Sequence, residues 1–164
     1  MARNGVELRL SIQPDLPAVK ADEAQLKQAL FNLLRNAREA MDKAIDKARD
    51  KAGDRGQAHA SAGTIDVRLE RGAAGGVLIT VEDEGAGIKP AARARLFEPF
   101  FSTKSHGTGL GLAITRQIVQ AHGGSISCEA REQRGTRFSI HLPEAASGER
   151  VAGTSATPDE LRVH

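Results

Sequence analysis

The sequence predicts a single α/β domain, in the α+β sense of strands that pair mostly with their neighbours along the chain. Three observations support this fold class. Several segments alternate apolar and polar residues as half-buried strands do, two pairs of them are separated by short turns that contain glycine, and the segments between have helical periodicity. With 164 residues, the chain is long enough for one sizeable core and too short for two.

Five segments are predicted strands. Residues 6–12 (VELRLSI) alternate cleanly and should be half-buried, and residues 64–70 and 76–83 should form a hairpin across GAAGG. A second, closing hairpin is predicted from residues 125–131 and 136–143. These strands supply one sheet near the middle of the chain and at its end.

Three segments are predicted helices. The longest begins after Asp22, a good N-cap residue, and its last part is the low-complexity Asp-Lys-Ala repeat of residues 42–55, which we expect to be a solvated extension. Residues 89–97 predict a short helix, and residues 108–124 an amphipathic one that ends at a pair of glycines.

Composition and charge exclude several classes of protein. The net charge of +2 and the absence of Trp and Tyr give no basis for nucleic-acid binding. A single cysteine, Cys128, excludes an internal disulfide and is expected to be a small core residue. No apolar run is long enough to span a bilayer and no signal peptide is evident, so we expect a cytoplasmic domain without direct membrane contact. Residues 144–164 are small and polar, which predicts a disordered tail after a domain of residues 1–143.

The long helix carries a polar line inside apolar surroundings. Leucine, alanine and Phe31 point in most directions around its axis, which predicts a helix buried on most sides. Gln28, Asn32 and Asn36 nevertheless follow one another at four-residue spacing. Because a buried amide without partners costs about 1–3 kcal/mol, this line either pairs internally or faces a ligand. An amide oxygen also suits Mg²⁺ that takes its other ligands from phosphates and water.

Two glycine-rich stretches could approach a ligand closely. Asp83 ends an apolar strand and is followed by Gly85 and Gly87, so its carboxylate could accept a hydrogen bond from an exocyclic amine such as that of adenine. In FFSTKSHGTGLGL (100–112), three glycines lead into a helix and Lys104 offers a positive charge, which favours an anion site. Neither a Walker A loop nor a dinucleotide fingerprint is present.

Four motifs in order resemble the catalytic and ATP-binding domain of bacterial sensor histidine kinases, a member of the superfamily that includes gyrase B. QALFNLLRNAREA is similar to the N box, DEGAGI to the G1 box, LFEPFFSTK to the F box and GTGLGLAI to the G2 box; GTRFSI resembles the final glycine-threonine motif. The resemblance implies a Bergerat-type two-layer sandwich, with a mixed, mostly antiparallel sheet, helices on one face, and ATP between the helices and a flexible lid.

The resemblance also implies roles for individual residues. Asn36 matches the asparagine that ligates Mg²⁺, Asp83 matches the aspartate that binds the adenine amine, and Lys104 would contact phosphate as a catalytic residue. The residues implied at the nucleotide site are Asn32, Asn36, Arg38, Glu39, Ala40, Asp83, Gly85, Gly87, Ile88, Phe97, Ser102, Thr103, Lys104, Gly107, Thr108, Gly109, Leu110, Gly111, Leu112 and Thr136. Phe97, Phe100 and Phe101 would anchor a very short lid, which we expect to become ordered when ATP binds.

Two features of the motifs bear on the reaction. Many relatives carry a lysine three residues after the magnesium asparagine; here that residue is Glu39, so Arg35 or Arg38 would have to contact phosphate from this side. Gyrase-like hydrolases have a glutamate one turn before that asparagine, whereas this chain has Asn32, which cannot act as a base. The expected reaction is therefore phosphoryl transfer rather than hydrolysis.

The implied function is that of the Mg-ATP-binding half of a two-component histidine kinase. None of the five histidines is followed by an acidic residue as an acceptor histidine usually is, so the chain should not phosphorylate itself, and His106 and His122 are expected to be structural or solvated. The expected partners are ATP, Mg²⁺, the dimerisation and phosphotransfer domain of the same kinase, and a response-regulator receiver domain, with the isolated domain a monomer. An anti-sigma-type serine kinase and a nucleotide-binding module without transfer activity remain alternatives.

Overall fold

The computed structural model describes residues 6–52, 63–102 and 107–146. Along the chain the elements are β1 (Glu7–Ile12), α1 (Glu23–Ala52), β2 (Thr64–Arg71), β3 (Val77–Asp83), α2 (Pro90–Arg93), α3 (Gly111–Ala121), β4 (Ser125–Ala130) and β5 (Thr136–Leu142). All five predicted strands are therefore confirmed. In the described part of the chain no helix is both long and apolar enough to cross a membrane.

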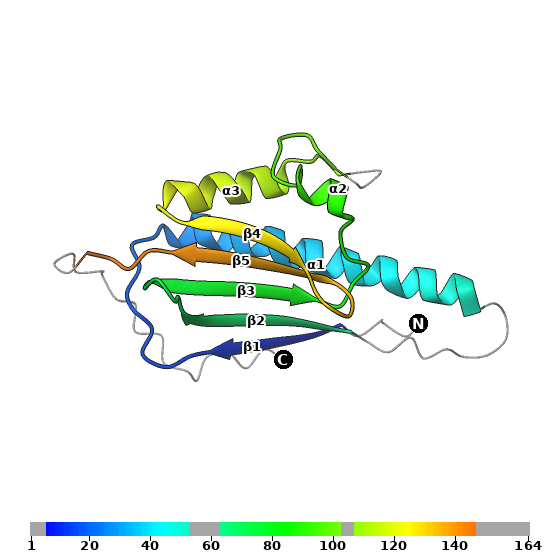
Figure 1. Ribbon diagram of the computed structural model, residues 1–164, viewed down its shortest axis with the longest axis horizontal. Coiled ribbons are helices and arrows are strands. Elements are labelled where there is room, and N and C mark those ends of the chain that lie inside the picture. Colours follow the sequence, from blue (N-terminus) through cyan, green and yellow to red (C-terminus); the bar gives the residue numbers. More distant parts are fainter. Residues whose placement is uncertain (1–5, 53–62, 103–106, 147–164) are drawn as a thin grey trace.

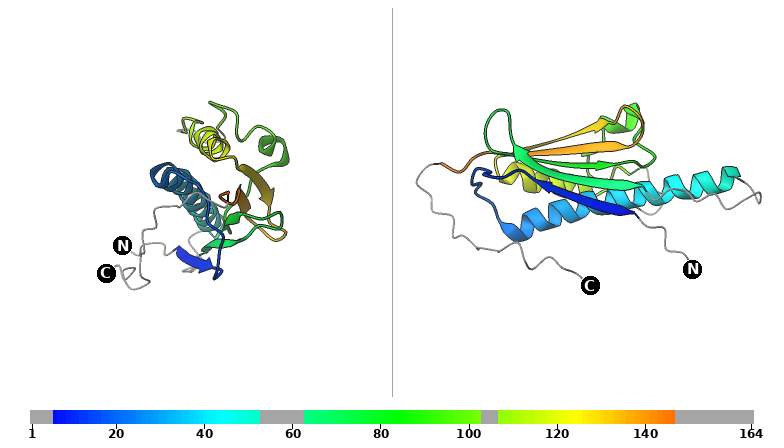
Figure 2. Two further views of the ribbon diagram at one scale, coloured as in Figure 1. Left: turned by 90° about the vertical axis from the view of Figure 1, so that its left-hand side faces the viewer. Right: turned by 90° about the horizontal axis from the view of Figure 1, so that it is seen from below.

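The five strands form one mixed sheet in the order β1-β2-β3-β5-β4, with β1 parallel to β2 and every other pair antiparallel (Figure 1). Helices α1 and α3 lie side by side on one face of this sheet, as the end-on view in Figure 2 shows. The predicted two-layer fold with helices on one face is confirmed. The parallel pair follows from the connection through α1, because two parallel neighbours need a long crossover.

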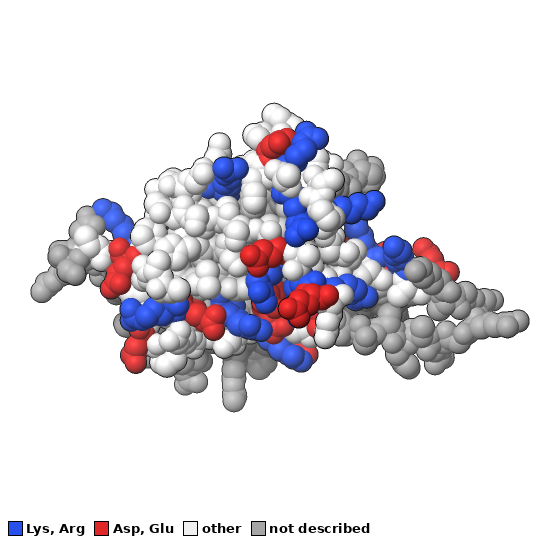
Figure 3. All heavy atoms as spheres, viewed as in Figure 1, with Lys and Arg blue, Asp and Glu red and all other residues white. Residues whose placement is uncertain are grey.

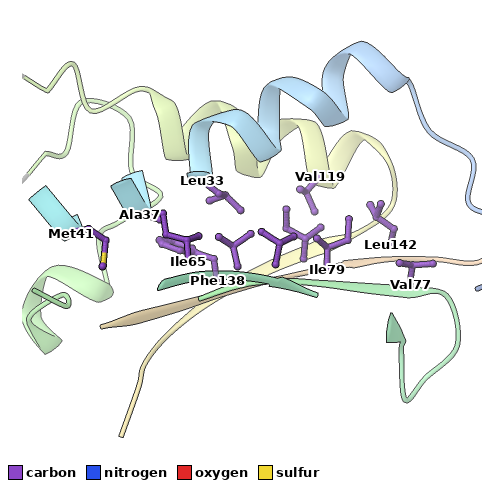
Figure 4. Packing of buried hydrophobic residues seen from close by; sticks show 12 residues of the cluster. Leu33, Ala37, Met41, Ile65, Val77, Ile79, Val119, Phe138 and Leu142 are labelled. Atoms are coloured by element: carbon purple, nitrogen blue, oxygen red, sulfur yellow. The ribbon is translucent and has the colours of Figure 1, made fainter. Parts of the chain in front are cut away.

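The core lies between α1 and the middle of the sheet. Ala29, Leu33, Ala37 and Met41 follow one another at four-residue spacing along α1 and are all buried. They pack against the inward side chains of β2, β3 and β5, among them Ile65, Val67, Ile79, Val81, Phe138 and Ile140 (Figure 4). Asp22 caps the helix as predicted, since its Oδ1 accepts a hydrogen bond from the Gln25 amide at 2.9 Å.

The expectation that α1 is buried on most sides is wrong for its outer surface. Phe31 is 66% exposed, because the sheet and α3 cover only two sides of the helix. Residues 6–12 are not half-buried either. Leu8, Leu10 and Ile12 are 56–59% exposed, since α1 packs over β2 and β3 and does not extend over β1.

Two predicted helices are shorter than expected. Helix α3 begins at Gly111 rather than residue 108, because Gly109 has φ +69°, a left-handed conformation that cannot continue a right-handed helix. Helix α2 ends at Arg93 rather than residue 97. Beyond it the Arg95 amide bonds the Ala92 carbonyl and the Leu96 amide the Arg93 carbonyl, so the chain there makes tighter three-residue turns.

The uncovered face of the sheet is polar (Figure 3). At its centre Glu82 is buried beneath arginine side chains from neighbouring strands and the turn after β4. Its Oε1 accepts a 2.7 Å hydrogen bond from Arg137 and lies 3.9 Å from Arg68, while Oε2 lies 3.5 Å from Arg131. The negative charge of Glu82 thus allows three arginine side chains to lie together over the sheet, and these side chains shield Glu82 from water.

Candidate functional site

A cavity of about 570 Å³ lies between α1, the ends of β3 and β5, and the segment that runs from α2 to α3. It contains most of the residues that the sequence placed at a nucleotide site. Those that line it are Asn36, Glu39, Ala40, Asp83, Gly87, Ile88, Ser102, Gly107, Thr108, Gly109, Gly111, Leu112 and Thr136. Four separate sequence motifs therefore meet around one space.

Helix α1 contributes one polar face to this cavity. Asn36, Glu39, Ala40 and Lys43 all line it, at the three- and four-residue spacing that places side chains on the same side of a helix. The turn at Lys43 belongs to the repeat that was expected to be only solvated, and Asp42 lines the cavity as well. That expectation is wrong for the first turn of the repeat; Met41 and Ile45 on either side are buried in the core face.

Asn32 has a different position from Asn36. Its side-chain NH₂ donates to the Gly111 carbonyl at 3.3 Å and to the Thr115 hydroxyl at 3.4 Å. Thr115 is fully buried and its hydroxyl in turn donates to the same Gly111 carbonyl at 2.8 Å. Asn32 is thus used to join α1 to the first turn of α3, beside the cavity rather than in its lining, while Gln28 is exposed.

Asp83 is the most deeply buried acidic group of the cavity, with 2% of its surface exposed. Its Oδ1 accepts a hydrogen bond from the Gly85 amide at 2.8 Å, and the Thr136 amide is its second backbone donor. Arg131 bonds the Asp83 backbone carbonyl instead of the carboxylate. Burial dominates, and it raises the pKa of the Asp83 carboxyl to about 6 against the opposing effect of these donors.

Glycines allow the strand ends to come close to α1 and to each other. A Cβ at Gly85 would lie 2.7 Å from the Ala40 backbone, and the next amide, that of Ala86, bonds the Ala40 carbonyl at 3.3 Å. At Gly135, with φ +105°, a Cβ would lie 1.8 Å from the Asp83 carbonyl oxygen. No side chain fits there, so the end of β3 is held between α1 and the turn before β5.

The segment that the sequence predicts to be a lid is closed at its base by a backbone hydrogen bond. The Phe100 amide donates to the Gly109 carbonyl at 3.1 Å, and Phe100 itself has φ +65° and is 78% exposed. Phe101 lines the cavity, with the Arg95 guanidinium 4.6 Å from the centre of its ring. Thr103, Lys104 and His106 lie outside the described residues, and the predicted ordering of the lid on ATP binding stays a prediction.

Arg35 is the arginine of the N-box-like stretch that reaches the cavity. It lines the cavity, and its Nη2 would lie 3.5 Å from a Cβ built on Gly111 at the start of α3. Arg38 points elsewhere on α1 and bonds Asp42 with its Nε at 3.1 Å. Of these two arginines, Arg35 lines the cavity and Arg38 does not.

Five other predicted residues lie off the lining. Asn32, Arg38, Gly85, Phe97 and Leu110 do not line the cavity, although Gly85 shapes it and Phe97 packs against the core. Sequence reasoning missed five lining residues: Asp42, Lys43, Ala86, Leu96 and Phe138. Helical spacing from Asn36 was a signal for Lys43, whereas Leu96 and Phe138 have only the pattern of core residues.

Comparison with known proteins identifies the family to which this site belongs. The model of the histidine kinase-, DNA gyrase B- and HSP90-like ATPase family matches residues 21–146, which include α1, the Asp83 turn and both ends of the lid segment. The chain belongs to this ATPase family.

Sensor kinases are among the relatives. The chain is 36% identical over 141 residues to the sensor histidine kinase ZraS of Salmonella typhimurium, covering 86% of this chain and 26% of ZraS. It is 41% identical over 143 residues to the C4-dicarboxylate transport sensor protein DctS of Rhodobacter capsulatus, covering 87% of this chain and 20% of that protein. The chain thus spans a fifth to a quarter of the length of these relatives.

Solved structures share the ATPase fold. The catalytic domain of the histidine kinase ThkA, in a nucleotide-free form, has 31% identity and a TM-score of 0.63, covering 86% of this chain and 80% of that one. Full-length ShkA, solved in complex with AMPPNP, has 30% identity and a TM-score of 0.65, covering 85% of this chain and 26% of that one.

The base of the lid segment gives a test of two neighbouring glycines. Gly109→Ala should lower the thermal midpoint by several degrees, because its φ is +69° and the new Cβ would lie 2.5 Å from the Phe100 backbone. Gly111→Ala is the matched control, since the atom nearest to its Cβ is 3.5 Å away in a flexible arginine, and its midpoint should hold or rise. Equal midpoints for the two variants would contradict the assigned geometry.

The raised pKa of Asp83 predicts a specific dependence of stability on pH. In the folded state the pKa of the carboxyl is about 6 instead of its ordinary 3.8, so the ionised carboxyl lowers the free energy of unfolding at neutral pH. This loss of stability disappears as the pH falls below both pKa values. Relative to Asp83→Asn, which does not titrate, the wild type should therefore gain about 3 kcal/mol between pH 7.5 and pH 3.5. Urea unfolding of both proteins across this range measures the difference; a constant difference would refute the shift.

Proposed function

We propose that the chain is the Mg-ATP-binding catalytic domain of a sensor histidine kinase and delivers the γ-phosphate of ATP to a histidine on a separate domain. The observation that carries the proposal is the meeting of Asp83, Asn36 and the glycine-rich start of α3 around one cavity. The Asp83 carboxylate can accept a hydrogen bond from the adenine amine. The Asn36 amide oxygen can ligate Mg²⁺, and the backbone amides at the start of α3 can bind the phosphates.

The chemistry of the cavity fits ATP. Its volume of about 570 Å³ lies within the range of small-molecule sites. The adenine would lie at the Asp83 end, where the carboxylate accepts a hydrogen bond from the exocyclic amine and Ile88 and Phe138 supply apolar walls. The phosphates would lie at the other end, against Gly107, Gly109 and the first turn of α3, where backbone amides and the helix dipole favour an anion.

Magnesium fits the α1 side of the same space. The Asn36 amide oxygen is a hard ligand of the kind that holds Mg²⁺ together with phosphate oxygens, and Asn36 lines the cavity in line with Lys43. When bound, the ion would neutralise charge on the phosphates. Asn36 would hold it, and the α1–α3 junction made by Asn32 would keep that helix face in position.

The surroundings of Asn32 support transfer over hydrolysis. An amide cannot remove a proton from water at neutral pH, and its NH₂ is already committed to Gly111 and Thr115. Both histidines within the described residues also make hydrogen bonds that hold the fold together. His122 bonds the Ile118 carbonyl and the Asp22 amide through its two ring nitrogens, and His141 bonds the Gly75 carbonyl. Neither of these two described histidines is placed to act as the phosphate acceptor.

A transfer assay tests this function. With γ-labelled ATP and Mg²⁺, the chain alone should acquire no stable label, whereas adding the dimerisation domain of its kinase in trans should place an acid-labile label on that domain. Asn36→Ala should remove both the label and Mg²⁺-dependent ATP binding by calorimetry. Phosphate release without an acceptor, at rates typical of an ATPase, would contradict the proposal, and so would label on a serine of a partner.

The two N-box arginines give a second, matched test. Arg35→Ala should weaken ATP binding about tenfold and leave adenosine binding unchanged, because a charge-assisted hydrogen bond to phosphate is worth about 1.5–3 kcal/mol. Arg38→Ala should change neither, since Arg38 does not line the cavity and its guanidinium is bonded to Asp42. Titration calorimetry with both ligands decides; equal losses for the two variants would overturn the assignment of Arg35.

A further inference from the structure

The turn between β4 and β5 lies beside the end of β3 (Figure 1). The Arg131 amide donates to the Gly135 carbonyl at 3.2 Å and so closes this turn. A Cβ at Gly135 would lie 1.8 Å from the Asp83 carbonyl oxygen, and a Cβ at Gly87 would lie 3.4 Å from the Gly135 carbonyl oxygen. The backbone of Asp83 and of the loop that follows it is therefore packed against the β4–β5 turn.

Two arginines of this turn donate to the backbone of that loop. Arg131 Nη1 bonds the Asp83 carbonyl at 3.1 Å, and Arg134 Nε bonds the Glu84 carbonyl at 2.7 Å. The peptide unit between Glu84 and Gly85 also carries the amide that donates to the Asp83 carboxylate at 2.8 Å. The two arginines thus fix the peptide units on both sides of Glu84, and with them the donor that the Asp83 carboxylate uses.

Arg131 is held from the opposite face of the sheet by Glu82. Neighbouring residues of a strand point to opposite faces, so Glu82 lies on the uncovered face and Asp83 in the cavity. Arg131 Nε lies 3.5 Å from Glu82 Oε2, and its side chain is 25% exposed, against 46% for Arg68 and 45% for Arg137. A planar guanidinium can contact two acceptors at once. Of the three arginines at Glu82, Arg131 is the one that also bonds Asp83.

We propose that Arg131 is a positioning residue for adenine: anchored on Glu82, it fixes the Asp83 backbone so that the carboxylate faces the exocyclic amine of the base. The inference rests on the proposed nucleotide function and goes beyond it, because Arg131 does not line the cavity and acts only through Asp83. Alignment matters here, since a hydrogen bond weakens steeply when its angle is poor.

Arg131 also affects the ionisation of Asp83. Burial raises the pKa of the Asp83 carboxyl to about 6, and the Gly85 and Thr136 amides and the positive charge of Arg131 oppose this rise. The charged side chains that line the same cavity from α1 are Arg35, Glu39, Asp42 and Lys43. Substitution of Arg131 leaves all of these in place, so loss of its charge alone should raise the pKa of Asp83 further.

A pair of nucleotides that differ in one amine tests the proposal. Calorimetry with Mg²⁺ compares ATP with purine riboside triphosphate, which lacks the exocyclic amine, and the wild type should prefer ATP. Arg131→Ala should weaken ATP binding about tenfold and change binding of the amine-free analogue less than about twofold, because a hydrogen bond to a charged group is affected in ATP alone. Arg137→Ala is the matched control: it removes a 2.7 Å bond to the same Glu82 carboxylate and should keep the preference for ATP.

Arg131→Lys separates position from charge and also serves if the alanine variant does not fold. Its ammonium keeps the positive charge but lacks the planar fork that contacts both Glu82 and Asp83. This variant should also lose preference for ATP. The pKa of Asp83, followed by carboxyl ¹³C NMR in the nucleotide-free proteins, should rise in Arg131→Ala and stay at the wild-type value in Arg131→Lys.

The outcomes separate this inference from the proposed function. A wild type that binds neither nucleotide would overturn the proposed function, and this inference with it. ATP binding by the wild type, together with any of three results, would overturn the inference alone: equal losses for the two nucleotides in Arg131→Ala, an equal loss of preference in Arg137→Ala, or full preference for ATP in Arg131→Lys. Each of these would leave Arg131 with a purely structural or purely electrostatic role.

Discussion

The buried charge of Asp83 is the constraint around which the site is arranged. Holding this carboxylate ionised at neutral pH costs the folded protein about 3 kcal/mol, a large share of a typical domain's stability. The cost is tolerated because the surrounding backbone is fixed: Gly85 and Thr136 donate to the carboxylate, and Gly135 packs against its carbonyl where no side chain could fit. A ligand amine that donates to the carboxylate would recover part of this cost, so the strain is localised where binding can relieve it.

The site has two parts. One is built on α1 and the end of β3, and the other on the segment between α2 and α3. Asp83 sits on the central strand of the sheet, and Asn36 on a helix anchored by its core face, by Asn32 and, at its start, by the hydrogen bond between the Asp22 amide and His122. The residues that would recognise adenine and hold Mg²⁺ therefore share one packed unit. The other end of the cavity is formed by the segment between α2 and α3, where the Phe100 amide bonds the Gly109 carbonyl.

Much of this arrangement was predictable, because it depends on local patterns. Alternation identified all five strands, Asp22 marked the start of α1, and four motifs in order indicated the site. What the sequence could not reveal were effects of tertiary context. The left-handed φ of Gly109 shortens α3, the reach of α1 decides that β1 is uncovered, and only the direction of each side chain separates Arg35 from Arg38. Lys43 was missed because it lies in a low-complexity segment, although its spacing from Asn36 indicates the same face of the helix.

Helix α1 is shared by every functional feature of the molecule. One of its flanks carries Asn36 and faces the cavity, and its inner side forms the core with the sheet. Packed interiors respond to a new neighbour by small rigid shifts rather than by local deformation. A change in the packing of the core face of α1 would therefore move Asn36 as well, because both lie on one rigid helix.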